Sequence, residues 1–251
     1  MKKIALYLLL LVTALTANAQ NRSIQFKDNA PWEEVLQQAR QENKLIFVDC
    51  YTSWCGPCKQ LAMYVFTQDS VADFFNARFI NAKYDMEKAA DGPALASKYN
   101  VRVYPTLLFI DPATGEAIHR MVGGFTKGAK LIEGGTLALT PDRNLAALMK
   151  RYRDGERDAD FLKQYLPVLS SAYMQEEVKQ VAGAYLDVLS VDEMATEENW
   201  ALIKSYVRDP LAVPLKTVMA HRGKFYALAG QEAVDAKLTK SIVDAVNELM
   251  S

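Results

Sequence analysis

The most informative segment of this 251-residue sequence is residues 45–59, which read LIFVDCYTSWCGPCK. Residues 45–48 are a short apolar run of the type that is buried in a central strand. The segment Cys55-Gly56-Pro57-Cys58 follows where that strand gives way to a helix, so Cys55 is expected at the N-terminus of the helix. Free backbone N–H groups there favour an anion and lower a thiol pKa from about 8.5 to roughly 3.5–7.5. Cys58 lies one turn later, close enough to attack a mixed disulfide formed by Cys55, which predicts a redox-active pair.

A CxxC segment can also supply half of a zinc site, which needs two further ligands. The sequence has three cysteines and no second CxxC segment, and its two histidines, His119 and His221, lie far apart in different halves of the chain. This spacing argues against a metal site. A purely structural disulfide between Cys55 and Cys58 is the other alternative, although it would be an unusual choice in so small a ring.

The N-terminus has the pattern of a secretory signal peptide over residues 1–19. A basic start, Met1-Lys2-Lys3, precedes an apolar run over residues 4–17, and Ala17-Asn18-Ala19 provides a cleavage site after Ala19. The apolar run is shorter than the about 20 residues that a membrane-spanning helix needs, and an uncleaved anchor is the alternative. We therefore expect a periplasmic or secreted protein that has no stable membrane insertion after cleavage.

The charge balance bears on the class of partner. The 29 Lys and Arg residues are matched by 30 Asp and Glu residues, and the sequence contains no long basic block. A nucleic-acid-binding protein would show a basic footprint. Half of the residues are apolar and 24% are charged, as in an ordinary folded protein. No nucleic-acid partner is therefore expected.

Two halves of different pattern follow the leader. Residues 20–138 alternate strand-like and helix-like segments, which indicates an α/β or α+β domain. The expected strands are residues 45–48, 79–84, 106–110 and 117–122, and the expected helices are residues 31–42, 59–75 with a break near 67–69, 93–99 and 127–132. Residues 139–251 show only helical periodicity, which predicts an all-α domain of five or six helices, arranged as a bundle or as helical hairpins. Thr140-Pro141 and Asp209-Pro210 are the predicted starts of two of these helices.

Five features of residues 30–137 resemble the thioredoxin family and come in the order of that family. Trp54-Cys55-Gly56-Pro57-Cys58-Lys59 is similar to its active-site motif, and Val48-Asp49 is similar to the segment with its buried aspartate. The other three are Asn81-Ala82-Lys83, Tyr104-Pro105-Thr106 and residues 115–123, which resemble its partner-lysine segment, its cis-proline strand and its closing hairpin with a glycine near the site. The resemblance implies an α/β thioredoxin fold, with a central mixed sheet flanked by helices. It does not cover the helical half.

The resemblance also implies catalytic roles for four of the matching residues. Cys55 would be the exposed nucleophile, and Cys58 would be the buried resolving thiol. Asp49, buried behind Cys58 with a raised pKa, would accept the proton of Cys58, and Lys83 would tune that carboxylate. An ordinary strand-end salt bridge between Asp49 and Lys83 is the alternative. No cofactor besides the Cys55–Cys58 disulfide is implied.

Residues around the disulfide would bind the substrate. Tyr104-Pro105 would face the disulfide, and a cis peptide there would leave the backbone open to pair with an extended substrate, whereas the alternative is a trans turn. Trp54 would shield the thiol and offer a docking surface, or would simply pack in the core. The expected substrate-binding set is completed by Gly56, Pro57, Thr106 and Gly123.

Cys50 departs from the family pattern, which commonly has an aromatic or other apolar residue at that position. Neighbouring residues of a strand point to opposite faces, so Cys50 and Asp49 should not share an environment. A buried free cysteine usually acts as a small hydrophobe. The alternative is a third redox thiol.

Together these observations predict an extracytoplasmic thiol–disulfide oxidoreductase that mainly reduces disulfides of substrate proteins. The Gly56-Pro57 pair resembles that of the reducing thioredoxins. The sequence shows no NADPH-binding motif, so a membrane thiol–disulfide protein is the expected electron donor. The alternatives are an oxidase or isomerase that assists disulfide formation, and a non-catalytic partner-binding module that uses the helical half.

Overall fold

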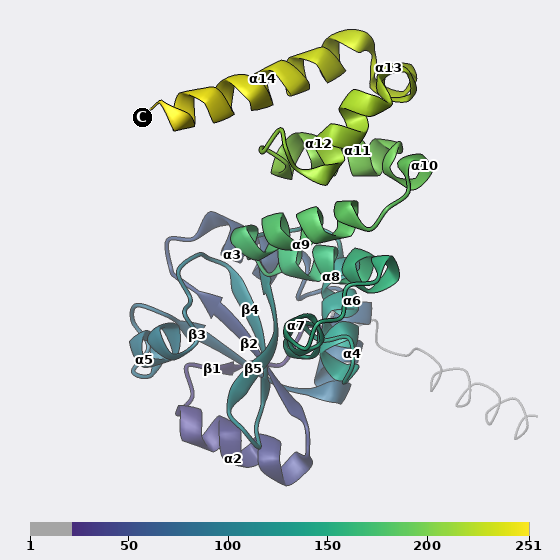
Figure 1. Cartoon of the computed structure of the whole chain (residues 1–251). Coiled ribbons are helices and arrows are strands. Elements are labelled where there is room, and N and C mark those ends of the chain that lie inside the picture. The colour runs from purple at the N-terminus through teal and green to yellow at the C-terminus, as the bar shows by residue number, and fades with distance from the viewer. Residues whose placement is uncertain (1–21, 251) are drawn as a thin grey trace, which may run out of the picture.

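The computed structural model describes residues 22–250 and places a five-stranded mixed sheet in the N-terminal half of the chain (Figure 1). The order across the sheet is β1-β3-β2-β4-β5, in which β1, β3 and β2 are parallel, while the pairs β2–β4 and β4–β5 are antiparallel. The strands are β1 (Lys27–Asp28), β2 (Leu45–Tyr51), β3 (Phe79–Asp85), β4 (Thr106–Asp111) and β5 (Glu116–Val122). The predicted signal peptide over residues 1–19 lies outside the described residues.

Helices cover both faces of this sheet (Figure 1). They are α2 (Trp32–Glu42), α3 (Gly56–Tyr64), α4 (Asp69–Arg78), α5 (Gly92–Lys98) and α6 (Gly128–Leu139). One apolar core joins α2 and α5 to the sheet, and a second core, rich in phenylalanine, joins α3, α4 and α6 to the opposite face. The predicted fold class is confirmed, and β1 is the strand of this half that the sequence pattern did not predict.

Strand β2 orients the site because its side chains alternate between these two cores. Ile46 and Cys50 lie in the core beside α2, whereas Phe47 lies in the core beneath α3 and α4. Asp49 is on the same side as Phe47, where it lines a small cavity together with Cys58 of α3. The predicted separation of Asp49 from Cys50 is therefore confirmed.

The C-terminal half is helical as predicted, but the described residues form eight helices there and not five or six. They are α7 (Leu145–Arg153), α8 (Ala159–Ser171), α9 (Gln175–Asp187), α10 (Val191–Met194), α11 (Glu197–Tyr206), α12 (Val213–Ala220), α13 (Arg222–Ala229) and α14 (Gln231–Leu249). Several of them are short, and α10 has only 4 residues between the polar N-caps Ser190 and Thr196. Hydrophobic periodicity does not resolve elements of that length.

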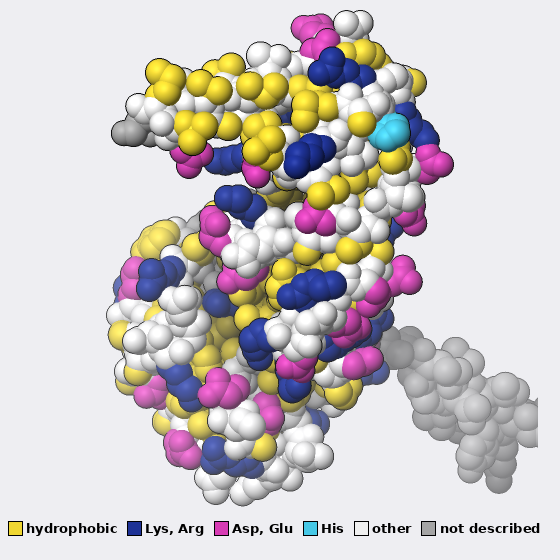
Figure 2. All heavy atoms as spheres, in the orientation of Figure 1, with side chains coloured by type: hydrophobic (Ala, Val, Ile, Leu, Met, Phe, Trp, Pro, Cys, Tyr) yellow, Lys and Arg dark blue, Asp and Glu magenta, His cyan; other side chains and the backbone are white. Residues whose placement is uncertain are grey.

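These helices pack in neighbouring pairs around a core of their own. Helix α8 packs beside α9, α9 contacts α11 and α12, and α13 packs beside α14. Figure 1 shows the pairs leading away from the sheet, an arrangement closer to stacked hairpins than to a single bundle. Helix α14 ends the stack, and Figure 2 shows apolar side chains along it, of which the exposed ones are Ile242, Val243, Val246, Leu249 and Met250. Within residues 22–250, no helix is both long and apolar enough to cross a membrane.

The predicted helix start at Thr140-Pro141 is wrong. Helix α6 runs on to Leu139, well past residue 132, and Thr140 is its C-cap. Helix α7 begins only at Leu145, after Asn144, whose side chain accepts a hydrogen bond from the backbone N–H of Ala147. The polar residue that caps this helix, Asn144, lies three residues after Pro141.

The predicted helix start at Asp209-Pro210 is wrong as well. The Asp209 carboxylate accepts the backbone N–H of Leu211 at 2.8 Å, and α12 begins at Val213. A polar residue followed by proline favours turns as well as helix starts, so the motif alone does not distinguish them.

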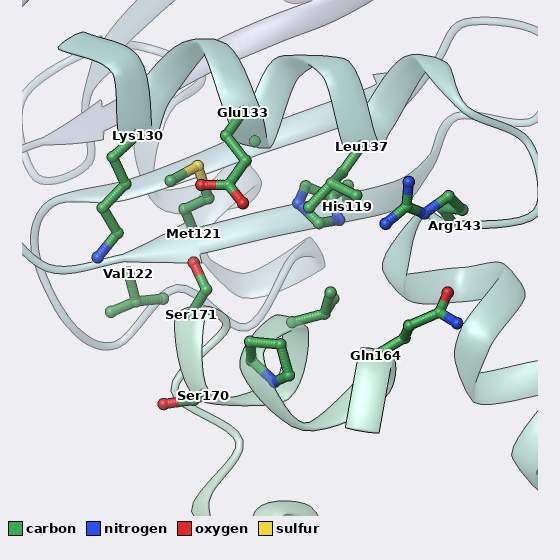
Figure 3. Close-up of a pocket in the computed structure, with 13 residues that line it drawn as sticks. His119, Met121, Val122, Lys130, Glu133, Leu137, Arg143, Gln164, Ser170 and Ser171 are labelled. Carbon is green, nitrogen blue, oxygen red and sulfur yellow. The ribbon is translucent and has the colours of Figure 1, made fainter. Parts of the chain in front are cut away.

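The two halves of the chain meet along β5. His119 of β5 is buried, and its Nδ1 accepts a hydrogen bond from the backbone N–H of Leu145 in α7 at 3.2 Å. Burial lowers the pKa of His119 to about 4. A cavity of about 530 Å³ lies beside this contact, lined by β5, α6 and α8, and Lys130, Glu133 and Arg143 point into it (Figure 3).

Candidate active site

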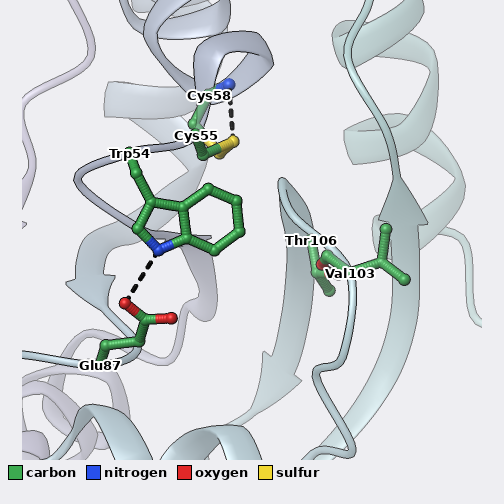
Figure 4. The surroundings of a disulfide bond; sticks show 6 residues. All are labelled: Trp54, Cys55, Cys58, Glu87, Val103 and Thr106. Atoms are coloured by element: carbon green, nitrogen blue, oxygen red, sulfur yellow. Dashed lines mark hydrogen bonds between the residues drawn. A yellow bond between two sulfur atoms is a disulfide. The ribbon is translucent and has the colours of Figure 1, made fainter.

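The cysteine pair lies at the start of α3, as the sequence predicts. Cys55 is the N-cap residue, and its Sγ accepts a hydrogen bond from the backbone N–H of Cys58 at 3.1 Å. Cys55 and Cys58 are joined in a disulfide (Figure 4). Pro57 occupies the first turn of the helix. When the pair is reduced, the same N–H group and the positive end of the helix stabilise a thiolate on Cys55.

The expected contrast in exposure between the two cysteines is not found. Cys55 is 3% exposed and Cys58 is 4% exposed, so Cys55 is as buried as its partner. In the disulfide form each sulfur covers part of the other. The expectation of an exposed Cys55 is therefore wrong for the oxidised protein.

Trp54 provides an exposed surface next to the disulfide. Its side chain is 64% exposed, which excludes the core-packing alternative. The indole Nε1 donates a hydrogen bond to Glu87 at 2.9 Å (Figure 4). The ring stands edge-on to Tyr104, with 5.9 Å between the ring centroids. Glu87, in the loop after β3, is a site residue that the sequence did not reveal.

The loop before β4 closes the site from the other side. The Tyr104–Pro105 peptide is cis, as predicted, and the Pro105 carbonyl accepts the backbone N–H of Gly123 at 2.9 Å. Thr106 is buried, and its hydroxyl donates to the Val103 carbonyl at 2.7 Å. The hydroxyl of Thr106, a residue of the predicted substrate-binding set, thus holds this loop in shape.

Two adjacent glycines complete this wall of the site. Gly123 has a φ of +93°, a left-handed conformation that favours glycine. At Gly124, a Cβ atom would lie 3.0 Å from Cβ of Pro57, so a larger residue would press on the active-site turn. Gly124 was not among the predicted residues, although the Gly-Gly pair was a visible signal.

Asp49 lies behind the disulfide, where the sequence places it. It is buried and lines a cavity of about 160 Å³ together with Cys58, Thr52, Lys59 and Lys83. Burial raises the pKa of Asp49 to about 7, against the opposing effect of the Lys83 charge. Among the described residues, Oδ1 of Asp49 has no hydrogen-bond partner. A carboxyl with a pKa near neutrality and next to Cys58 can both accept and release a proton at physiological pH.

Lys83 is opposite Asp49 in the register of β2 and β3, but the two side chains form no salt bridge. The Lys83 ammonium instead lies 2.9 Å from the carboxylate of Asp28 on β1. The alternative of a simple Asp49–Lys83 ion pair is therefore wrong, and Lys83 acts on Asp49 through space. Asp28 is a further residue that the sequence did not reveal, because β1 has only 2 residues.

Cys50 is a free cysteine buried in the apolar core beside α2. Burial raises the pKa of its thiol, and the neighbouring Asp49 charge adds to that effect. These surroundings match those of a small hydrophobe. Over residues 22–250, the structure contains no cluster of three His, Cys, Asp or Glu residues that could hold a metal ion.

The mixed sheet is covered by helices on both faces, and the disulfide lies at the N-terminus of one of them. These two features together define a disulfide oxidoreductase. The thioredoxin family model matches residues 23–134, and Thioredoxin H2 of Arabidopsis thaliana is 30% identical over 109 residues, which are 43% of this chain and 74% of that protein. The chain belongs to the thioredoxin family.

Two further relatives show how much of the chain is similar to known proteins. The thiol:disulfide interchange protein DsbD of Tatumella citrea is 30% identical over 116 residues, 45% of this chain but only 20% of that protein. The solution structure of a candidate disulphide-isomerase from Bacteroides thetaiotaomicron is 45% identical and covers 49% of this chain and 98% of its own, with a TM-score of 0.43. The family model does not match residues 135–251.

Proposed function

We propose that the protein is an extracytoplasmic reductase of protein disulfides. The observation that carries the proposal is the pairing of Cys55 at the N-terminus of α3 with a buried carboxyl, Asp49, next to Cys58. One group of this arrangement stabilises the attacking thiolate, and the other handles the proton of the resolving thiol.

In the reducing cycle the Cys55 thiolate attacks a substrate disulfide. A Cys55–substrate disulfide forms, the substrate disulfide breaks, and the leaving sulfur takes up a proton. Cys58 then passes its proton to Asp49, and the Cys58 thiolate attacks the Cys55 sulfur. The Cys55–Cys58 disulfide re-forms, the second substrate sulfur leaves as a thiolate and is protonated, and two electrons have passed to the substrate.

Residues around the disulfide supply the docking surface in this proposal. Trp54, Tyr104 and Pro105 present side chains or backbone beside the disulfide, and Gly56, Pro57, Gly123 and Gly124 allow close approach of an extended chain. The reducing direction is supported by the Gly56-Pro57 pair and by the similarity to proteins named thioredoxin.

The leader supports the proposed location, and the similarity to two DsbD proteins supports the proposed electron donor. Residues 1–19 have the pattern of a signal peptide, which supports a periplasmic or secreted protein. The similarity to DsbD proteins, which are named for thiol:disulfide interchange, supports a membrane thiol–disulfide protein as donor of the two electrons.

The reduction potential of the Cys55–Cys58 couple tests the direction. We would titrate the chain from Gln20 onward against glutathione, with Cys50→Ser to leave a single redox pair. A value near or below about −250 mV supports a reductase, and a value near −120 mV identifies an oxidant of folding proteins instead. If Cys55→Ser/Cys58→Ser leaves the cellular phenotype and partner binding unchanged, the protein is a binding module that acts through its helical half.

A further inference from the structure

Asp28, Lys83 and Asp49 form one row across three neighbouring strands. Asp28 of β1 is the register partner of Lys83 in β3, and Lys83 is the register partner of Asp49 in β2. Side chains at register positions lie on the same face of a sheet and close together. The single ammonium of Lys83 therefore stands between two carboxyl groups, one on either side.

In the structure Lys83 is bound to the outer carboxylate. Its Nζ lies 2.9 Å from Oδ2 of Asp28, and the Asp28 side chain is 53% exposed. Asp49 is buried and forms no salt bridge with Lys83. An exposed carboxylate keeps its solvation when it pairs, whereas pairing with Asp49 requires a charge in the interior. Among residues 22–250, the inner carboxyl has no salt-bridge partner.

The other charged or titratable groups around Asp49 are few. The small cavity that it shares with Cys58 is also lined by Lys59 of α3, by Tyr51 at the end of β2 and by Lys83. On the β4 side its register partner is the apolar Leu107. Lys83 is the charge that lowers the proton affinity of Asp49, and burial is the opposing effect.

We propose that Asp28 is a positioning residue that holds Lys83 away from Asp49 and thereby keeps Asp49 able to exchange a proton with Cys58. The role of Asp28 in catalysis rests on the proposed function. Its effect on the protonation of Asp49 does not, and can be measured independently of any activity. Without Asp28, Lys83 is free to turn inward and pair with the Asp49 carboxylate. Such a pair stabilises the charged form of Asp49 and weakens its hold on a proton.

The test is a pH titration of the Asp49 carboxyl group in the oxidised protein, monitored by the ¹³C NMR shift of its carboxyl carbon. The Asp49→Asn variant assigns that signal. Asp28→Asn is expected to lower the midpoint by about one pH unit or more. Asp73→Asn is the matched control, because Asp73 is also half exposed (54%) and paired with an arginine, Arg22. The control is expected to leave the Asp49 midpoint unchanged.

A double-mutant cycle separates positioning from a direct effect of the Asp28 charge. Lys83→Gln alone is expected to raise the Asp49 midpoint, and adding Asp28→Asn to it should change nothing further. If Asp28→Asn lowers the midpoint equally with and without Lys83, or has no effect in the wild-type background, the positioning role is overturned.

Reduction of insulin disulfides, measured across pH with dithiothreitol as donor, tests the two ideas separately. If the protein is a reductase, the acidic limb of its pH profile should move to lower pH in Asp28→Asn by the same amount as the Asp49 midpoint. A protein that never reduces insulin contradicts the proposed function, whereas an unmoved midpoint contradicts the role of Asp28.

Discussion

The indole nitrogen of Trp54 donates a hydrogen bond to the carboxylate of Glu87 at 2.9 Å, across 33 residues of sequence. This bond fixes an aromatic side chain that is 64% exposed directly before Cys55. An exposed aromatic ring contributes little to the stability of a fold but offers a large apolar contact to a partner.

Trp54→Ala should therefore weaken substrate binding much more than folding. We expect KM for a protein disulfide such as insulin to rise several-fold and the denaturation midpoint to change little. Glu87→Gln, which keeps a hydrogen-bond acceptor beside the indole, should have a smaller effect on KM. An unchanged KM in Trp54→Ala would show that substrates dock elsewhere.

The two cysteines should be distinguishable by trapping. Cys58→Ser leaves the Cys55 thiolate at the helix N-terminus without a resolving thiol, so covalent mixed disulfides with substrate proteins should accumulate. Cys55→Ser should trap none, and Cys50→Ser should retain full activity because Cys50 is buried on the other side of the sheet. Non-reducing gels and mass spectrometry measure the adducts, and trapping through Cys58 instead of Cys55 would reverse the assigned order.

Asp49 should make the oxidised protein less stable at high pH. Its pKa is raised from 3.8 to about 7 on folding, so the folded state binds more protons than the unfolded state between these values, and stability falls as the pH rises through them. Asp49→Asn removes this effect and should stabilise the protein at pH 8 by up to about 4 kcal/mol, with little change near pH 4. Urea unfolding at both pH values measures the difference, and Asp73→Asn provides the surface control.

His119 should act in the opposite sense. Its pKa is lowered from 6.5 to about 4 by burial, so the unfolded state binds more protons in that window and stability is lost as the pH falls through it. The loss amounts to about 3 kcal/mol. His119→Gln should flatten this part of the pH dependence, while His221→Gln, at an exposed position, should leave it intact. An identical slope in both variants would contradict the assignment to His119.

The N-terminal half was accessible from sequence because local signals agree there. The apolar run of β2, the CxxC turn and the proline before β4 each mark one element, and their order is typical of a single family. Strand β1 was missed because 2 residues carry no periodicity, and it becomes visible only through its pairing with β3.

The sequence predicted which residues form the site but not how their side chains interact. The resemblance to the thioredoxin family implied that Asp49 is buried behind Cys58. That Lys83 pairs with Asp28 and not with Asp49 depends on a strand pairing that spans more than 50 residues. The burial of Cys55 depends on the disulfide itself, in which each sulfur covers part of the other, and no local sequence pattern encodes that. In the helical half, the prediction depended on hydrophobic periodicity, which does not detect short helices separated by capping residues.

Because the C-terminal helices pack against β5, they protect the outer edge of the sheet. Strand β5 is an outer strand, which within the described part of the chain pairs only with β4, through a ladder with a bulge near Phe109 and Ile110. An outer strand is a template on which other chains can aggregate, and β-proteins commonly limit this with bulges, charges or prolines. Here α7 and α8 pack against β5 as well. The helical half thus helps to keep an aggregation-prone margin of the sheet away from other chains.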